Sequence, residues 1–158
     1  MPQYQTPARA LYGRLGASSA LLSIATGGVW DKPIVRLGPQ ATPGAFAPTP
    51  PHRQLPAISI PDNGEEFDPL GPSTAFYAFP QVWFYADDDP NGNGRDALEL
   101  AVAQARSDVQ GWTYITTTGT GVGFRVIGRF GVRTDPTDEN RLIDYLRLQA
   151  DGLWTGDI

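Results

Sequence analysis

The sequence predicts an α+β fold: an antiparallel or mixed sheet of about four to five strands, packed against one main helix, with a second helix near the N-terminus. Three stretches carry this prediction. Residues 74–86 and 124–133 alternate with the period of a strand, and residues 95–110 have the period of an amphipathic helix. A chain of 158 residues is most simply one domain with a core of its own.

The N-terminal segment is expected to form a helix, intact or broken, over about residues 7–25. Thr6 and Pro7 fit an N-cap followed by proline in the first helical position. Gly13 and Gly16 weaken the middle of this helix, and either Ser18 or Ser19 offers a place for it to begin again.

A proline-rich segment over 33–54 follows, and it is expected to be an extended insertion without ladders or helices. Two interpretations stay open: a surface loop, or a stiff arm that lies on a partner with Phe46 as its anchor. Under either, residues 38–49 should be removable without unfolding the chain. Leu55–Ile60 then reads as a short strand.

The aromatic stretch over 74–86 is expected to be one long strand. One face would carry Phe76, Ala78, Val82, Phe84 and Ala86, and the other Tyr77, Phe79, Gln81, Trp83 and Tyr85. Turn residues over 87–94 end it. The main helix follows, with a buried stripe of Leu98, Val102, Ala105 and Val109. Asn93 is the expected N-cap, with Asp96 three residues on, and Gly111 ends the helix.

The C-terminal half is expected to add strands over 112–118 and 124–133. In the second strand, Val122, Phe124, Val126, Phe130 and Val132 would share one face, and Arg125, Ile127, Arg129 and Arg133 the other. Residues 134–140 form a turn. By local propensity, residues 141–149 can be a helix that begins near Thr137 or a returning strand.

Composition excludes several classes of protein. The net charge of −5 argues against a nucleic-acid binder, and the absence of cysteine excludes disulfides and thiolate sites. The N-terminus lacks the pattern of a signal peptide, and no apolar run approaches the length of a membrane helix. We therefore expect folding in a cytoplasm and no membrane contact.

The acidic turn partly imitates a calcium loop. Asp87, Asp89, Asn91 and Gly92 fit its start. The carboxylate required at the twelfth position is missing, because Leu98 stands there. A solvated acidic turn explains the pattern better, and we predict no metal site.

Other candidate sites are weaker still. Gly119, Gly121 and Gly123 lead into a strand rather than a helix N-terminus, which does not suit a phosphate site. His52 is the only histidine and has no carboxylate placed to orient it. The sequence therefore predicts no catalytic residue and no cofactor.

The arginines over 125–133 are the most suggestive charged feature. Arg125, Arg129 and Arg133 would form one basic row along a strand. This row is either a solvated sheet face or a surface that pairs with acidic residues of a neighbouring subunit, such as Asp87 and Asp89. Trp83 and Tyr85, two aromatic residues on one face of the 74–86 strand, complete the predicted protein interface.

The order of elements resembles the tail-completion or tail-terminator proteins of long-tailed bacteriophages and related tail-like particles. The resemblance is carried by the opening helix Ala8–Ile24, the Gly28-Val29-Trp30-Asp31 link, the strand Leu55–Ile60, the Val82-Trp83-Phe84-Tyr85 strand, the helix Ala97–Val109 and the closing Asp135–Leu148 turn and strand. The segment Pro33–Gln54 is an apparent insertion relative to this pattern.

The resemblance implies a non-enzymatic α+β virion protein in the tail or neck, assembled in the host cytoplasm. It implies a homo-oligomeric ring, most simply a hexamer, with the tail tube protein and a head–tail connector protein as partners. DNA would pass through the lumen without sequence-specific contact. The resemblance also favours a strand over 141–149, antiparallel to 123–133, which needs a partner edge. Two alternatives stay open: another neck or connector protein of the same particle, and a small non-viral ligand-binding or enzymatic domain.

Overall fold

The computed structural model describes residues 3–4, 6–34, 43–61, 75–116, 119 and 121–153. They form one mixed sheet with three helices on one side, so the predicted α+β class is confirmed. The sheet is larger than predicted. Its order is β1-β6-β7-β9-β5-β3-β2, with β4 and β8 also paired to β9, which makes nine strands.

The N-terminal helix is broken in two. The helix α1 spans Pro7–Gly16 and α2 spans Ser19–Ile24. The hydroxyl of Thr6 accepts a hydrogen bond from the amide of Arg9, and that of Ser18 accepts one from Leu21, so each helix has its own N-cap. Short strands lie on either side of these helices: β1 at Gln3–Tyr4 and β2 at Val29–Trp30.

The predicted strand over 74–86 is divided into two. Strands β4 (Ala75–Ala78) and β5 (Gln81–Asp87) both pair antiparallel with β9, and Phe79 and Pro80 interrupt the ladder between them. Proline cannot donate a ladder hydrogen bond, which explains the interruption. Within β5 the predicted alternation holds, because Val82, Phe84 and Ala86 are buried. Thr74 lies outside the described residues.

The main helix α3 spans Asn93–Val109 and packs its predicted stripe into the core. Its N-cap is Gly92, at φ 75°, rather than Asn93. The predicted cap is wrong because Asp89 lies within reach. The Asp89 carboxylate accepts a hydrogen bond from the Asn93 amide, and this turn needs a left-handed residue at position 92. Gly111 follows the helix at φ 76°, as expected of a C-terminal stop.

The C-terminal half forms the centre of the sheet. Strand β6 spans Thr113–Thr116, β7 spans Gly121–Arg129, β8 spans Arg133–Asp135 and β9 spans Asp138–Leu153. The prediction of a strand over 141–149 is confirmed, since β9 pairs antiparallel with β7, β5, β4 and β8. The predicted strand over 124–133 is interrupted after Arg129.

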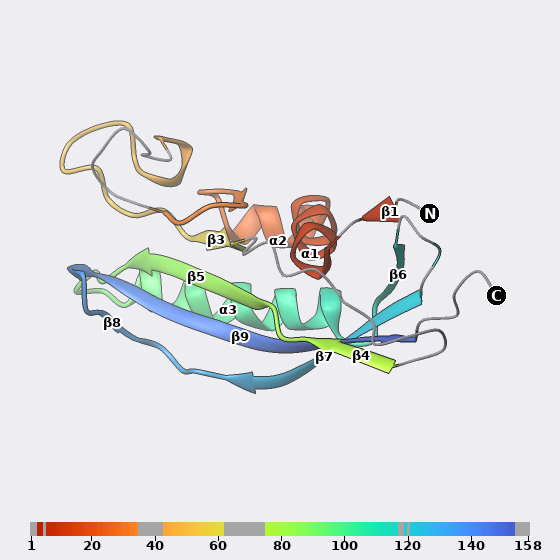
Figure 1. Ribbon diagram of the computed structural model, residues 1–158. Helices are drawn as coiled ribbons and strands as arrows, with labels where there is room; N and C mark the ends of the chain where they lie inside the picture. The colour runs from red at the N-terminus through yellow and green to blue at the C-terminus, as the bar shows by residue number, and fades with distance from the viewer. Residues whose placement is uncertain are drawn as a thin grey trace.

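The layers are clear in Figure 1, where β5 and β9 lie along α3, and α1 and α2 lie on the far side from β8. The core fills the space between the sheet and the helices. Its largest members include Leu11, Leu15, Leu21, Phe84, Leu98 and Leu146, none more than 1% exposed. Within the described part of the chain, no helix is long and apolar enough to cross a membrane.

The proline-rich segment is more ordered than the sequence predicts. Pro43–Ala45 form a 3-10 turn, and Phe46 forms a bridge with Gln54, just before strand β3 at Ala57–Ser59. Ala45 and Phe46 are buried with Ile34 and Ala57 in a second cluster. Residues 43–46 thus contribute to a small core, which argues against the expectation that residues 38–49 can be removed without unfolding the chain. The deletion itself stays a prediction, and residues 35–42 lie outside the described chain.

Candidate functional site

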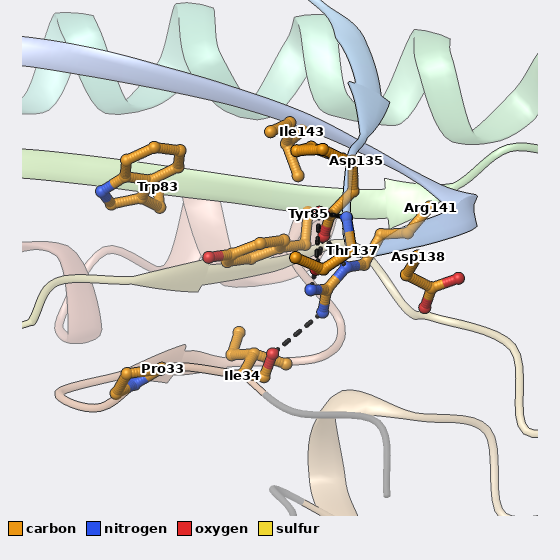
Figure 2. Close-up of a pocket in the computed structure, with 10 residues that line it drawn as sticks. Pro33, Ile34, Trp83, Tyr85, Asp135, Thr137, Asp138, Arg141 and Ile143 are labelled. Carbon is orange, nitrogen blue, oxygen red and sulfur yellow. Dashed lines mark hydrogen bonds and ion pairs between the residues drawn. The ribbon is translucent and has the colours of Figure 1, made fainter.

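A buried ion pair lies where β8, β9 and the proline-rich segment meet. Arg141, near the start of β9, contacts Asp135 at the end of β8: its Nη2 is 2.6 Å and its Nε 2.7 Å from Oδ2 of Asp135. The two side chains are only 8% and 7% exposed. Figure 2 shows the guanidinium between Asp135 and the backbone of Ile34, to which its Nη1 donates over 2.9 Å.

Gln54 connects the proline-rich segment to the same guanidinium. Its Oε1 accepts from Nη1 of Arg141 at 3.2 Å, and its Nε2 donates to the carbonyls of Ala45 and Leu55. The ring of Tyr85 lies 4.4 Å from the guanidinium carbon of Arg141. The donors of Arg141 are thus directed to groups of its own chain, and its role is to hold the segment against the sheet.

Asp135 is held as a carboxylate by this arrangement. Burial alone raises the pKa of Asp135, but hydrogen bonds from the amide and hydroxyl of Thr137, together with the hydrogen bond and charge of Arg141, outweigh burial and lower the pKa below its usual value. Burial also raises the pKa of Tyr85, against the effect of Arg141. Neither group titrates near neutral pH, so neither is poised for acid–base catalysis.

A pocket of about 620 Å³ opens beside this ion pair. Its lining, most of it labelled in Figure 2, is Pro33, Ile34, Trp83, Tyr85, Asp135, Pro136, Thr137, Asp138, Arg141 and Ile143. The walls are mostly aromatic, aliphatic and proline side chains, and the buried ionic groups among them pair with each other. Such a pocket suits an apolar side chain of a partner better than a reacting polar substrate.

A row of stacked side chains continues from the pocket across the sheet. Trp83 and Tyr145 are cross-strand neighbours with ring centroids 4.6 Å apart, and Phe130 stacks on Tyr145 at 4.5 Å. Arg133 covers the ring of Phe130, with its guanidinium carbon 3.2 Å from the ring centroid. These rings hold one another in place on the side of the sheet away from α3.

A second stack lies one step along the same side. Arg147 is the register partner of Gln81 in β5, and its guanidinium carbon lies 5.2 Å from the ring centroid of Phe79. Phe79 is 45% exposed and Arg147 is exposed. We call the six residues of the two stacks the aromatic–arginine face: Phe79, Trp83, Phe130, Arg133, Tyr145 and Arg147.

The predicted row of arginines on β7 does not exist as one face. The register shifts between Val126 and Gly128, so Ile127 is an extra residue and the strand reverses its faces there. Arg125 pairs with Gln149, but Arg129 pairs with Leu146, whose side chain is fully buried. For the same reason Phe130 lies against Tyr145 rather than beside the buried Phe124.

Arg129 is instead committed to its own chain. It donates at 2.7 Å to the buried Asp144 of β9 and at 2.7 Å to Glu99 of α3. Arg125 lies 4.0 Å from Asp151 and donates to Gln149. Of the three predicted arginines, only Arg133 belongs to the aromatic–arginine face, and an interface role for the others stays a prediction.

The other predicted interface residues are dispersed. Asp87 lies 4.0 Å from Arg53, and Asp89 caps the amide of Asn93. Phe46 is 6% exposed within its own chain, so it is not available as an arm anchor in this conformation. Trp83 and Tyr85 line the pocket as described above.

The remaining sequence candidates acquire no ligand-binding geometry. Among the described residues, no group of three or more His, Asp and Glu side chains is arranged to hold a metal. The ring of His52 has its Nδ1 2.9 Å from the carbonyl of Ala47, which accounts for its orientation in the loop. Gly121 and Gly123 are part of strand β7, not of a phosphate-binding turn.

Sequence reasoning missed Arg141, Tyr145 and Arg147 as members of the site. They fell in a stretch whose secondary structure was ambiguous, so their facing direction could not be assigned. Once β9 is a strand, its odd-numbered positions alternate with buried Leu142, Leu146 and Leu148, which places all three on one side. That alternation was the available signal.

Comparison with known proteins gives a likeness of fold. No protein-family model matches the chain, and no curated protein matches it. Among solved structures, the chain is similar to one chain of the "Virion of native gene transfer agent (GTA) particle", with a TM-score of 0.61 and 16% sequence identity over 93% of this chain and 94% of that chain. At this identity the likeness establishes that the two chains share a fold, over nearly their whole lengths.

Proposed function

We propose that this chain is a structural virion protein: a tail terminator that assembles into a ring at the head-proximal end of a tail tube and joins it to the head. The observation that carries the proposal is the likeness of fold to a chain of a gene transfer agent virion. It spans 94% of that chain, so it involves the whole domain and not only a common substructure.

The site supports a role in assembly. Its pocket has apolar walls, its buried charges neutralise one another, and its outer part is a row of aromatic and arginine side chains. Aromatic and arginine residues are enriched at the energetic centres of protein interfaces. Terminator action needs only surface complementarity: one side of the ring matches the last ring of the tube, and the other side does not continue it.

In this proposal the ring is a homo-oligomer, most simply of six copies, in the tail or neck of the particle. Its partners are the tail tube protein and a head–tail connector protein, and DNA passes through its lumen. No catalytic residue, cofactor or metal is assigned. Assembly takes place in the host cytoplasm before the head and tail are joined.

Deletion of the gene from the genome that encodes the particle tests the proposed function. We expect negative-stain electron microscopy to show tails of uncontrolled length, or heads and tails that fail to join, with a plasmid copy of the gene restoring normal particles. Normal-length tails joined to heads in the absence of the protein would contradict the assignment.

The same experiment separates the candidate components. The solved structure is described as a whole virion, which leaves another neck or connector protein as the second candidate. Tails of uniform, normal length that stay free of heads would identify such a connector. Light scattering of the purified chain, with and without tube protein, tests the ring directly.

A further inference from the structure

Two arginines of the aromatic–arginine face have no acidic partner among the described residues. Most of the arginines described above have acidic partners, such as Arg129 with Asp144 and Arg141 with Asp135. Arg133 and Arg147 stack on rings instead, and no acidic side chain in the described part of the chain pairs with either. A surface of this kind fits a partner that brings carboxylates together with an apolar side chain.

The opposite side of the molecule presents that combination. On α3, Asp96 and Leu100 are four residues apart and therefore share one face of the helix. Leu100 is 59% exposed, although it is a leucine in the middle of the main helix. Asp88 is exposed just before the turn that leads into α3. We call Asp88, Asp96 and Leu100 the acidic surface.

We propose that the aromatic–arginine face docks on the acidic surface of a second copy of this chain. This inference rests on the proposed function, and it names the contact by which copies associate. Leu100 of one copy enters the pocket beside Trp83 of the next, while Asp88 and Asp96 approach Arg133 and Arg147.

The placement of the two surfaces permits a closed assembly. The helix α3, which carries Asp96 and Leu100, covers one side of the sheet (Figure 1), whereas the aromatic–arginine face lies on the other side. One copy can therefore use both surfaces at the same time. A contact between two different surfaces is heterologous, and such contacts generate rings when the rotation between copies closes.

The face is also prepared for docking before a partner arrives. Trp83, Tyr145 and Phe130 stack on one another, and Arg133 is stacked on Phe130, with its Nη2 donating to the Phe130 carbonyl at 3.2 Å. Side chains that are already held in one arrangement lose little conformational entropy on binding. The pocket next to them offers an apolar seat for one leucine side chain.

Charge exchange across the contact tests the proposal. The face variant is Arg133→Glu with Arg147→Glu, and the acidic variant is Asp88→Arg with Asp96→Arg. The control, Arg9→Glu with Arg106→Glu, makes the same change of net charge as the face variant, on exposed helical residues outside both surfaces. Sedimentation velocity over a wide range of concentration measures self-association, and circular dichroism with thermal melting confirms that each variant is folded.

We expect the wild type and the control to associate alike, and each variant alone to associate about a hundredfold more weakly or not at all. An equimolar mixture of the two variants should recover association. At one contact the introduced glutamates of the face variant meet the introduced arginines of the acidic variant. At the next contact the unchanged acidic surface of the face variant meets the unchanged aromatic–arginine face of the acidic variant. Leu100→Ser provides a second perturbation that leaves charge unchanged, and it should weaken association at any salt concentration.

Three results would overturn the proposal: a wild type that stays monomeric at every concentration, variants that associate normally, or a mixture that does not recover. Binding of labelled double-stranded DNA that is lost in the face variant, with self-association intact, would identify a nucleic-acid surface instead. The gene-removal experiment judges the proposed function independently, so a failure of this contact is distinguishable from a failure of the function.

Discussion

Replacement of Arg141 by methionine tests the structural role of the buried ion pair. In Arg141→Met, the carboxylate of Asp135, which is 7% exposed in the wild type, loses its cation, and the carbonyl of Ile34 and the Oε1 of Gln54 lose their donor. The loss of one partner from a buried pair costs about 3–5 kcal/mol, because the remaining charge is uncompensated. That is a large share of the roughly 5–15 kcal/mol that stabilises a typical domain.

The expected change in thermal stability follows from the size of the chain. For domains of about this length, 1 kcal/mol corresponds to roughly 2–4 °C in Tm, so the variant should melt about 6–20 °C below the wild type. Urea unfolding followed by tryptophan fluorescence measures the free energy directly, since Trp83 lines the pocket beside Arg141 and reports on its surroundings.

Two further variants decide between the ion pair and a general effect of the substitution. Arg147→Met removes an exposed arginine from the same strand and should change stability by no more than about 0.5 kcal/mol. The double variant Arg141→Met with Asp135→Leu should recover much of the loss, because no buried charge is then left alone. A loss below about 1 kcal/mol in Arg141→Met would refute the reasoning.

Three other predictions concern pH, backbone geometry and the proline-rich segment. The pKa of Asp135 is lower in the folded state than in the unfolded state, so the carboxylate stabilises the fold at pH values above its unfolded pKa. This contribution is lost as the pH falls through the folded pKa. In urea unfolding, the difference in stability between the wild type and Asp135→Asn should therefore shrink toward acid pH. Gly94→Ala would place a Cβ against the backbone carbonyl of Asp87 and should lower the free energy of unfolding by about 1–3 kcal/mol. Gly16→Ala, where a Cβ would meet open space, should not lower the free energy of unfolding in the same urea titration. Phe46→Ala should lower the free energy of unfolding by about 3–5 kcal/mol, because the side chain is buried. The control Phe79→Ala, at an exposed position, should lower it by no more than about 0.5 kcal/mol. Equal melting temperatures for the two variants would show that Phe46 is not part of a core.

Local pattern by itself determined several elements of this protein. The stripe from Leu98 to Val109 specified the main helix, since burial at helical spacing is a local property. Thr6 indicated the start of the N-terminal helical segment, because a capping hydrogen bond spans only three residues, whereas the break in that segment was left open by the sequence. The alternation over Val82, Phe84 and Ala86 likewise gave the buried side of β5.

The site depended on contacts that no local pattern contains. The bulge at Ile127 reverses the faces of β7, and its position is set by the register against β9. It removed Arg129 from the predicted basic row and brought Phe130 onto Tyr145. A one-residue slip changes the side of every later side chain, because the side-chain period of a strand is two.

The burial of the proline-rich segment was also decided only by the tertiary structure. Prolines indicated an absence of regular ladders and helices over 33–54, and the described residues 33–34 and 43–54 contain only a 3-10 turn and an isolated bridge. Prolines say nothing of what the segment lies against. Its anchor is Arg141, which is 107 residues from Ile34 along the chain. The contact between that guanidinium and that carbonyl is fixed by strand order and register rather than by the sequence near either residue, because the two residues are so far apart in the chain.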